Sequence, residues 1–301
     1  MFKRTYLYHL TLPIALSILV VLSGCSSVAM TGRKQLLLVS DDEVLQSSAA
    51  SYNQLIAGAV RSTNRVQSAR VTTVGQRIAR ATEAYLKANS REHEAKRMAW
   101  EFNVIKDDQI NAFCMPGGKI AVYDGILALT PTDDDLAVVM GHEIAHAVAK
   151  HGNERISQSI MANYGAQVLQ GTLEGSVTTK AIVNQLFNIG TDLVYLKPFE
   201  RKHELEADKM GLILMAMAGY NPQVAVDFWK RMAAVKGSEG NGNDFFSTHP
   251  SDEKRAAQLA ALMPEAVKIY EQYRHLYTPQ TRPNTPTKRT PVQRRIRPSK
   301  K

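Results

Sequence analysis

The chain has 301 residues, of which 44% are hydrophobic and 22% are charged, a composition that excludes a largely disordered protein. Its net charge of +9 comes from the ends, because residues 272–301 carry nine Lys and Arg and no acid, and residues 1–24 carry two. The body between them holds 26 basic against 28 acidic side chains. This balance excludes a basic nucleic-acid-binding domain, so we expect no nucleic-acid partner.

The first 24 residues predict an export signal. Two basic residues precede the apolar run 10–22, which is shorter than the roughly 20 residues that a membrane-spanning helix needs. Leu-Ser-Gly-Cys at 22–25 resembles the lipobox of bacterial lipoproteins, which implies a lipid on Cys25. By resemblance to enterobacterial lipoprotein sorting, Ser26 after that cysteine implies an outer-membrane lipoprotein facing the periplasm. The alternative is an ordinary signal peptide with an incidental cysteine.

The next segments predict a tether and then a folded domain. Residues 25–39 form the tether, and Ser40 followed by three acidic residues predicts a capped helix start. A second helix is expected within 71–89. Strands are expected at 99–107 and 117–127, with a connecting segment at 108–118.

From Asp133 onward the apolar pattern is helical. The expected helices cover 133–151, 153–170, 177–193, 200–218, 222–235 and 251–272. Residues 273–301 are rich in Pro, Thr and Arg and predict a basic disordered tail. The predicted fold class is α+β, mostly α, with one domain at 40–272.

The sequence Gly-His-Glu-Ile-Ala-His at 141–146 places two imidazoles one helical turn apart in an apolar helix. His142 and His146 can therefore bind one zinc ion, with Glu143 beside the open coordination position as a general base for peptide hydrolysis. The alternatives are a helix with polar residues on its wet side, or a zinc site without catalytic activity.

A third ligand is expected from the helix after residue 200. Glu204 and Asp208 lie one turn apart, so Glu204 can bind zinc while Asp208 accepts the free N–H of a ligand histidine. Glu206 is expected to point elsewhere, into solvent. His151 is expected to be a helix-end residue, since five residues separate it from His146 with no glycine to turn the chain.

Four segments, at 111–127, 141–146, 200–211 and 247–255, resemble the HtpX and CAAX-prenyl-protease type of gluzincin metallopeptidases, particularly its exported lipoproteins. The resemblance covers about 66–270. It implies a zincin-like fold, one Zn²⁺ on His142, His146 and Glu204, and Glu143 as the base. The family often has Ser where this chain has Glu200.

A strand preceded by Pro116-Gly117-Gly118 is well suited to an exposed sheet edge. Such an edge can bind an extended polypeptide through main-chain hydrogen bonds. The candidate substrate-binding residues are Asn111, Ala112, Phe113 and Gly118; a plain structural strand is the alternative. Cys114 is expected to be an inert filler in the connecting loop.

These observations predict a lipid-anchored zinc endopeptidase. The family resemblance and the expected location imply that its substrates are unfolded or misassembled envelope proteins. A zinc-bearing chaperone or scaffold is the alternative. The basic tail is expected to attract anionic lipid or lipopolysaccharide, or to have no partner. His249 follows the Gly-rich segment 237–243, which is expected to be flexible. Three roles are expected for His249: a fourth zinc ligand that blocks the site, an oxyanion stabiliser, or a locally packed residue.

Overall fold

The computed structural model describes residues 25–170, 200–235, 245, 249 and 253–277. The predicted signal peptide, the predicted helix at 177–193, the segment 237–243 and residues 278–301 of the predicted tail lie outside the described residues. Residues 273–276, predicted to belong to the disordered tail, are helical. Among the described helices, none combines the length and apolarity needed to cross a bilayer. The elements, in chain order, are β1 Cys25–Ser27, β2 Lys34–Leu36, α2 Asp41–Gly58, α3 Arg65–Ala88, α4 Glu92–Ala95, β3 Glu101–Ile105, β4 Ala112–Met115, β5 Lys119–Tyr123, α5 Asp124–Leu127, α6 Asp133–Val148, α7 His151–Gln170, α9 Arg201–Met217, α10 Val224–Val235, α12 Glu253–Tyr273 and the 3₁₀ turn η2 Arg274–Leu276.

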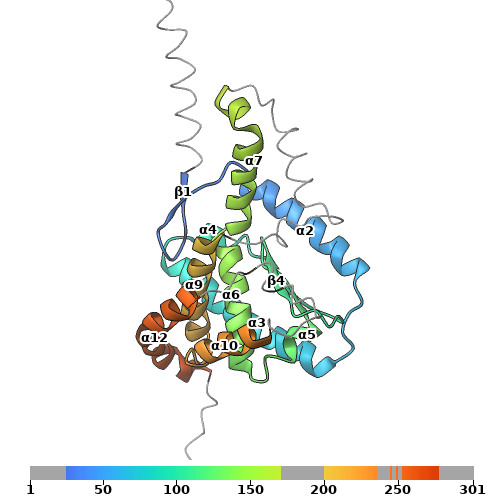
Figure 1. Ribbon diagram of the computed structural model, residues 1–301, viewed down its shortest axis with the longest axis vertical. Helices are drawn as coiled ribbons and strands as arrows, with labels where there is room; N and C mark the ends of the chain where they lie inside the picture. Colours follow the sequence, from blue (N-terminus) through green and yellow to red (C-terminus); the bar gives the residue numbers. More distant parts are fainter. Residues whose placement is uncertain (1–24, 171–199, 236–244, 246–248, 250–252, 278–301) are drawn as a thin grey trace, which may run out of the picture.

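The fold is α+β and mostly α, as predicted, with α6 at its centre (Figure 1). Helix α6 packs against α3, α9, α10 and β4. Every residue from Asp135 to Val148 is buried, so this part of the helix has no solvent-exposed face. Thr132 caps it in a reciprocal box with Asp135, and Ser40 caps α2 as the sequence predicts. The alternative of a helix with polar residues on a solvated face is therefore wrong.

Helices α6 and α9 cross at two glycines. A Cβ atom on Gly211 would lie 2.8 Å from the carbonyl carbon of Gly141 and 2.8 Å from the backbone nitrogen of His142. The two backbones are therefore in direct contact, which only glycine permits here. This contact brings Glu204, two turns earlier on α9, against the histidines of α6.

The helix predicted over 133–151 is broken near its end. Helix α6 ends at Val148 and α7 begins at His151, because Lys150 has a positive φ of 60°. The Lys150 ammonium is 2.7 Å from the Asp41 carboxylate of α2, which holds this strained residue in place. The expectation that the chain does not turn before His151 is therefore wrong.

The larger sheet has the strand order β3-β5-β4, with β3 parallel and β4 antiparallel to β5. The strand after Pro116-Gly117-Gly118 is therefore the central strand, which corrects the expectation of an exposed edge there. Residues 112–115, expected in a connecting loop, form the edge strand β4. Gly117 and Gly118 have φ values of 83° and 80°, which allow the tight turn between the two strands.

Candidate metal centre

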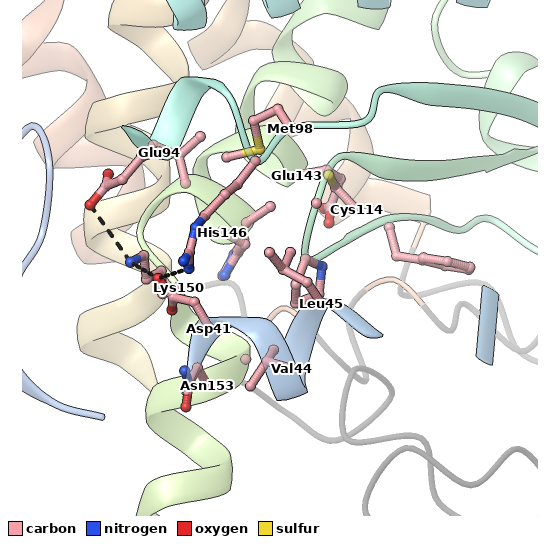
Figure 2. Close-up of a pocket in the computed structure, with 17 residues that line it drawn as sticks. Asp41, Val44, Leu45, Glu94, Met98, Cys114, Glu143, His146, Lys150 and Asn153 are labelled. Atoms are coloured by element: carbon pink, nitrogen blue, oxygen red, sulfur yellow. Dashed lines mark hydrogen bonds and ion pairs between the residues drawn. The ribbon is translucent and has the colours of Figure 1, made fainter. Parts of the chain in front are cut away.

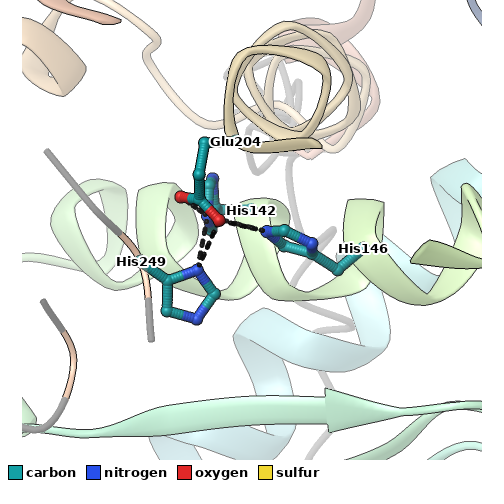
Figure 3. A group of neighbouring side chains, drawn as sticks. All are labelled: His142, His146, Glu204 and His249. Atoms are coloured by element: carbon teal, nitrogen blue, oxygen red, sulfur yellow. Dashed lines mark hydrogen bonds and ion pairs between the residues drawn. The ribbon is translucent and has the colours of Figure 1, made fainter. Parts of the chain in front are cut away.

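Four side chains from three parts of the chain converge in the interior (Figure 3). His142 and His146 come from α6, Glu204 comes from α9, and His249 precedes α12. One nitrogen or carboxylate oxygen from each lies within 4.8 Å of the others. All four residues are buried, with at most 3% of their surface exposed. The fold thus brings Glu204 together with His142 and His146, as predicted, although about 60 positions separate Glu204 from the two histidines.

The hydrogen bonds around the two histidines assign their protons. Asp208 Oδ1 lies 3.0 Å from His142 Nδ1, and His151 Nδ1 lies 2.9 Å from His146 Nδ1. We therefore place each ligand proton on Nδ1, which leaves a lone pair on each Nε2. The two Nε2 atoms are 3.1 Å apart and 3.4 and 3.3 Å from the Glu204 carboxylate. Two lone pairs and a carboxylate that face one another fit a bound cation.

Arg255 of α12 organises the carboxylates behind the histidines. Its guanidinium binds Asp208 through two nitrogens at 2.7 and 2.8 Å and reaches Glu204 at 2.9 Å. Burial raises the pKa of Asp208, but the charge and hydrogen bonds of Arg255 and a hydrogen bond with His142 bring it below the usual range. Asp208 therefore remains an acceptor for His142, as predicted. The role of Arg255 was not predicted, although it lies in one of the four motif segments.

Glu143 lies next to this cluster and is 2% exposed. Its Oε1 atom is buried and lacks a hydrogen-bond partner among the described residues; it is 3.4 Å from His249 Nε2. Burial raises the pKa of Glu143 to about 7. A buried carboxylate in this state is suited to accept and return a proton.

An open cavity extends from Glu143 and His146 toward α2 (Figure 2). Its apolar walls include Val44 and Leu45 of α2, Met98, and Phe113 of β4. Charged residues stand at one side, where the Lys150 ammonium joins Asp41 and Glu94. The cavity wall beside Glu143 is therefore largely apolar.

A sequence profile of peptidase family M48 matches residues 65–263. The chain belongs to peptidase family M48. This confirms the resemblance drawn from the four motif segments, and the metal of M48 peptidases is zinc. The donor set on α6 and α9 is one that zinc accepts, since two imidazoles and a carboxylate are a common catalytic ligand set.

Relatives of this M48 chain carry peptidase names. The mitochondrial metalloendopeptidase OMA1 of Schizosaccharomyces pombe is 39% identical over 56% of this chain and 48% of its own length. The metalloprotease LoiP of Escherichia coli is 26% identical over 82% of this chain and 93% of its own length. A β-barrel assembly-enhancing protease of Yersinia pestis is 22% identical over 53% of this chain and 33% of its own. The chain spans about half the length of the OMA1 proteins of Schizosaccharomyces pombe and Saccharomyces cerevisiae.

The other predicted site residues lie along the sheet of the M48 domain. Ala112 and Phe113 are buried in β4, which pairs only with β5 among the described strands. The Asn111 carbonyl accepts a hydrogen bond from the Tyr123 amide, and Gly118 lies in the turn before β5. Of these four residues, Phe113 lines the cavity. Whether substrate pairs with this strand stays a prediction.

Cys114 is in β4, not in a loop. Its side chain is buried, and burial raises its pKa well above the usual range. The thiol therefore remains protonated at neutral pH. This agrees with the expectation of an unreactive residue.

Glu206 is not solvated, contrary to the expectation. It is 7% exposed and receives hydrogen bonds from Thr31, Arg33 and His151. Burial raises its pKa, but the hydrogen bonds of His151, Thr31 and Arg33 bring it down to about 2. No local pattern indicates this, because Arg33 lies 173 positions away in the chain.

Proposed function

We propose that this chain is a zinc-dependent endopeptidase anchored by lipid in the bacterial cell envelope. Its substrates would be unfolded or misassembled envelope proteins. One observation carries the proposal: the buried donor set of His142, His146 and Glu204 lies beside Glu143, whose carboxylate faces an open cavity.

The residues have distinct tasks in peptide hydrolysis. His142, His146 and Glu204 would hold zinc, with Asp208 and Arg255 fixing their orientation. When bound, zinc would supply Lewis-acid activation of water and of the scissile carbonyl. Glu143 takes the proton from the attacking water and returns it to the leaving amine. An amide bond therefore breaks without a covalent enzyme intermediate.

The cavity and β4 support a substrate in extended form. The side of β4 away from β5, which pairs with no described strand, would offer main-chain hydrogen bonds to an unfolded segment, while the cavity beside Phe113 would take one apolar side chain. Such a site selects an unfolded, apolar polypeptide rather than one defined sequence. The name of the Yersinia pestis relative, which refers to β-barrel assembly, supports envelope proteins as the substrate class.

The anchor and the tail extend this proposal to the membrane. A lipid on Cys25 would hold the domain at the outer membrane, facing the periplasm, and the basic tail would contact anionic lipid or lipopolysaccharide. Loss of labelled-palmitate incorporation in Cys25→Ala tests the anchor. Salt-sensitive binding to anionic vesicles that disappears when 278–301 are deleted tests the tail.

The proposed activity predicts about one zinc per chain and casein digestion that a chelator stops. Glu204→Ala should weaken zinc binding by at least about 100-fold, because a buried ligand is removed. The measurements are metal content and zinc affinity by chelator competition. Glu200→Ala, an exposed carboxylate before the same helix, is the matched control and should keep the metal. Wild-type chain with zinc but no cleavage of any unfolded substrate would favour the chaperone alternative.

The position of His249 supports a role as a latch, a fourth zinc ligand that blocks the site. Its Nδ1 lies 3.0 Å from Glu204 Oε1 and 3.3 Å from His142 Nε2, so it could act as that ligand. We expect His249→Ala to cleave casein faster. A latch closed in nine tenths of the molecules would slow cleavage about tenfold.

The assay for His249→Ala is kcat at saturating zinc, with exposed His275→Ala as the control. A lower kcat with little change in KM would instead assign oxyanion stabilisation to His249. An unchanged rate would leave a packing role.

A further inference from the structure

The hairpin formed by β1 and β2 reaches the back of the metal centre. Arg33 lies at the end of the turn between β1 and β2. Its Nε is 2.7 Å from Glu206 Oε2, and its two terminal nitrogens are 2.9 and 2.6 Å from the Glu154 carboxylate. Thr31, in the same turn, also donates to Glu206. One arginine therefore joins the hairpin to α7 and α9.

A chain of hydrogen bonds continues from Glu206 to a metal-site histidine. His151 Nε2 lies 3.0 Å from Glu206 Oε2, and His151 Nδ1 lies 2.9 Å from His146 Nδ1. His151 is fully buried, and the group beside its Nε2 is a carboxylate, which can only accept, so the ring proton is on Nε2. Its single N–H donates to Glu206, which leaves Nδ1 to accept the N–H of His146. The His146 lone pair is then on Nε2, which faces Glu204.

We infer that the N-terminal hairpin is a positioning element of the zinc site, acting through Arg33, Glu206 and His151 on the ligand His146. The inference rests on the proposed zinc-dependent function. None of the three residues touches the reacting atoms; together they fix the tautomer and the ring orientation of one ligand. The hairpin begins at Cys25, the residue that we propose to be lipidated, so a lipid there would be connected to the metal centre through these hydrogen bonds.

The charges explain why Arg33 matters for a ligand that it does not touch. Glu154 and Glu206 both point at its guanidinium, and each is at least 93% buried. Without the guanidinium, two buried carboxylates would lose their shared partner and repel each other. Glu206 would then shift and no longer orient His151. A lysine cannot replace the arginine fully, because one ammonium lacks the planar fork that serves both carboxylates.

The experiment measures zinc affinity by chelator competition on the full chain in detergent. His151→Phe keeps an aromatic ring but loses both hydrogen bonds, so we expect about 10–100-fold weaker zinc binding. His151→Gln, whose amide can both donate and accept, should restore most of this loss. Arg33→Leu should weaken binding about tenfold, and the visible spectrum of the Co²⁺-substituted chain should change with both disruptive variants.

Ser27→Ala is the matched control. Ser27 accepts a hydrogen bond from Arg91 at 2.9 Å, so this variant also loosens the hairpin but leaves the chain from Arg33 to His146 intact. It should keep wild-type zinc affinity and the wild-type cobalt spectrum. Thermal unfolding of the zinc-free chains shows that each variant is folded.

Two outcomes separate this inference from the proposed function. If wild type binds zinc and cleaves casein but Arg33→Leu and His151→Phe bind zinc as tightly as wild type, the inference alone is wrong. If wild type binds no zinc, the proposed function is wrong and the inference with it. Should His151→Phe fail to fold, Arg33→Leu and the rescue by His151→Gln decide the question.

Discussion

Glu143→Gln should lower the rate of casein cleavage by about 100-fold to 10,000-fold while the purified chain keeps one zinc. The magnitude is that of a lost general base. The amide has nearly the shape of the carboxylate, so the buried position beside Cys114 and His146 stays filled. Zinc is retained because Glu143 does not belong to the donor set of His142, His146 and Glu204. The measurements are initial rates and zinc content on the same preparation.

Glu94→Gln is the matched control for this prediction. Glu94 lines the same cavity, but its carboxylate binds Arg91 and Lys150 and lies outside the metal cluster. The variant should cleave at a rate within a few-fold of wild type. Cleavage by Glu143→Gln at the wild-type rate would remove the base from the mechanism. Loss of zinc from Glu143→Gln would mean that Glu143 is a ligand.

The Glu143→Gln variant also distinguishes the peptidase from the chaperone alternative. A chaperone that holds unfolded chains does not need a base, so its holding activity would be equal in wild type and Glu143→Gln. For the peptidase we expect the variant to retain bound substrate that wild type would cut. Capture of an unfolded protein by Glu143→Gln, followed by its release on competition with unlabelled substrate, measures this.

The metal ligands could be predicted from sequence because their spacing is local. His142 and His146 are one turn apart on α6, and Glu204 and Asp208 are one turn apart on α9. Helical periodicity alone places each pair on one face. That the two pairs meet depends on the crossing of α6 and α9, and here the family resemblance supplied what periodicity could not.

The surroundings of the ligands could not be predicted because they depend on contacts distant in sequence. His151 reaches His146 through a turn at Lys150, whose positive φ has no glycine or asparagine to signal it. Glu206 is buried by Arg33, and Asp208 is held by Arg255, 47 positions later. The order of the strands could not be predicted either. It depends on the parallel pairing of β3 with β5, and the alternation of apolar and polar side chains along a strand does not indicate which strands pair.

Gly211→Ala should lower the free energy of unfolding by about 1–3 kcal/mol and weaken zinc binding about tenfold. Inside a helix, a change from Gly to Ala normally stabilises by up to about 1 kcal/mol. Here the added methyl would lie 2.8 Å from the backbone of α6, so α9 must move away. Because Glu204 is on α9, its carboxylate would move away from His142 and His146, and metal sites tolerate displacements of only about 0.5 Å.

Gly58→Ala provides the comparison for the helix crossing. Gly58 is the last residue of α2 and a Cβ there would meet no atom within 4 Å, so this variant should be neutral or slightly stabilising and should keep zinc. Urea unfolding of the zinc-free chains and chelator competition measure the two effects separately. If Gly211→Ala matched Gly58→Ala in both, close contact between α6 and α9 would not be what assembles the metal centre. A loss of stability without loss of zinc affinity would show that Glu204 can follow the histidines when its helix shifts.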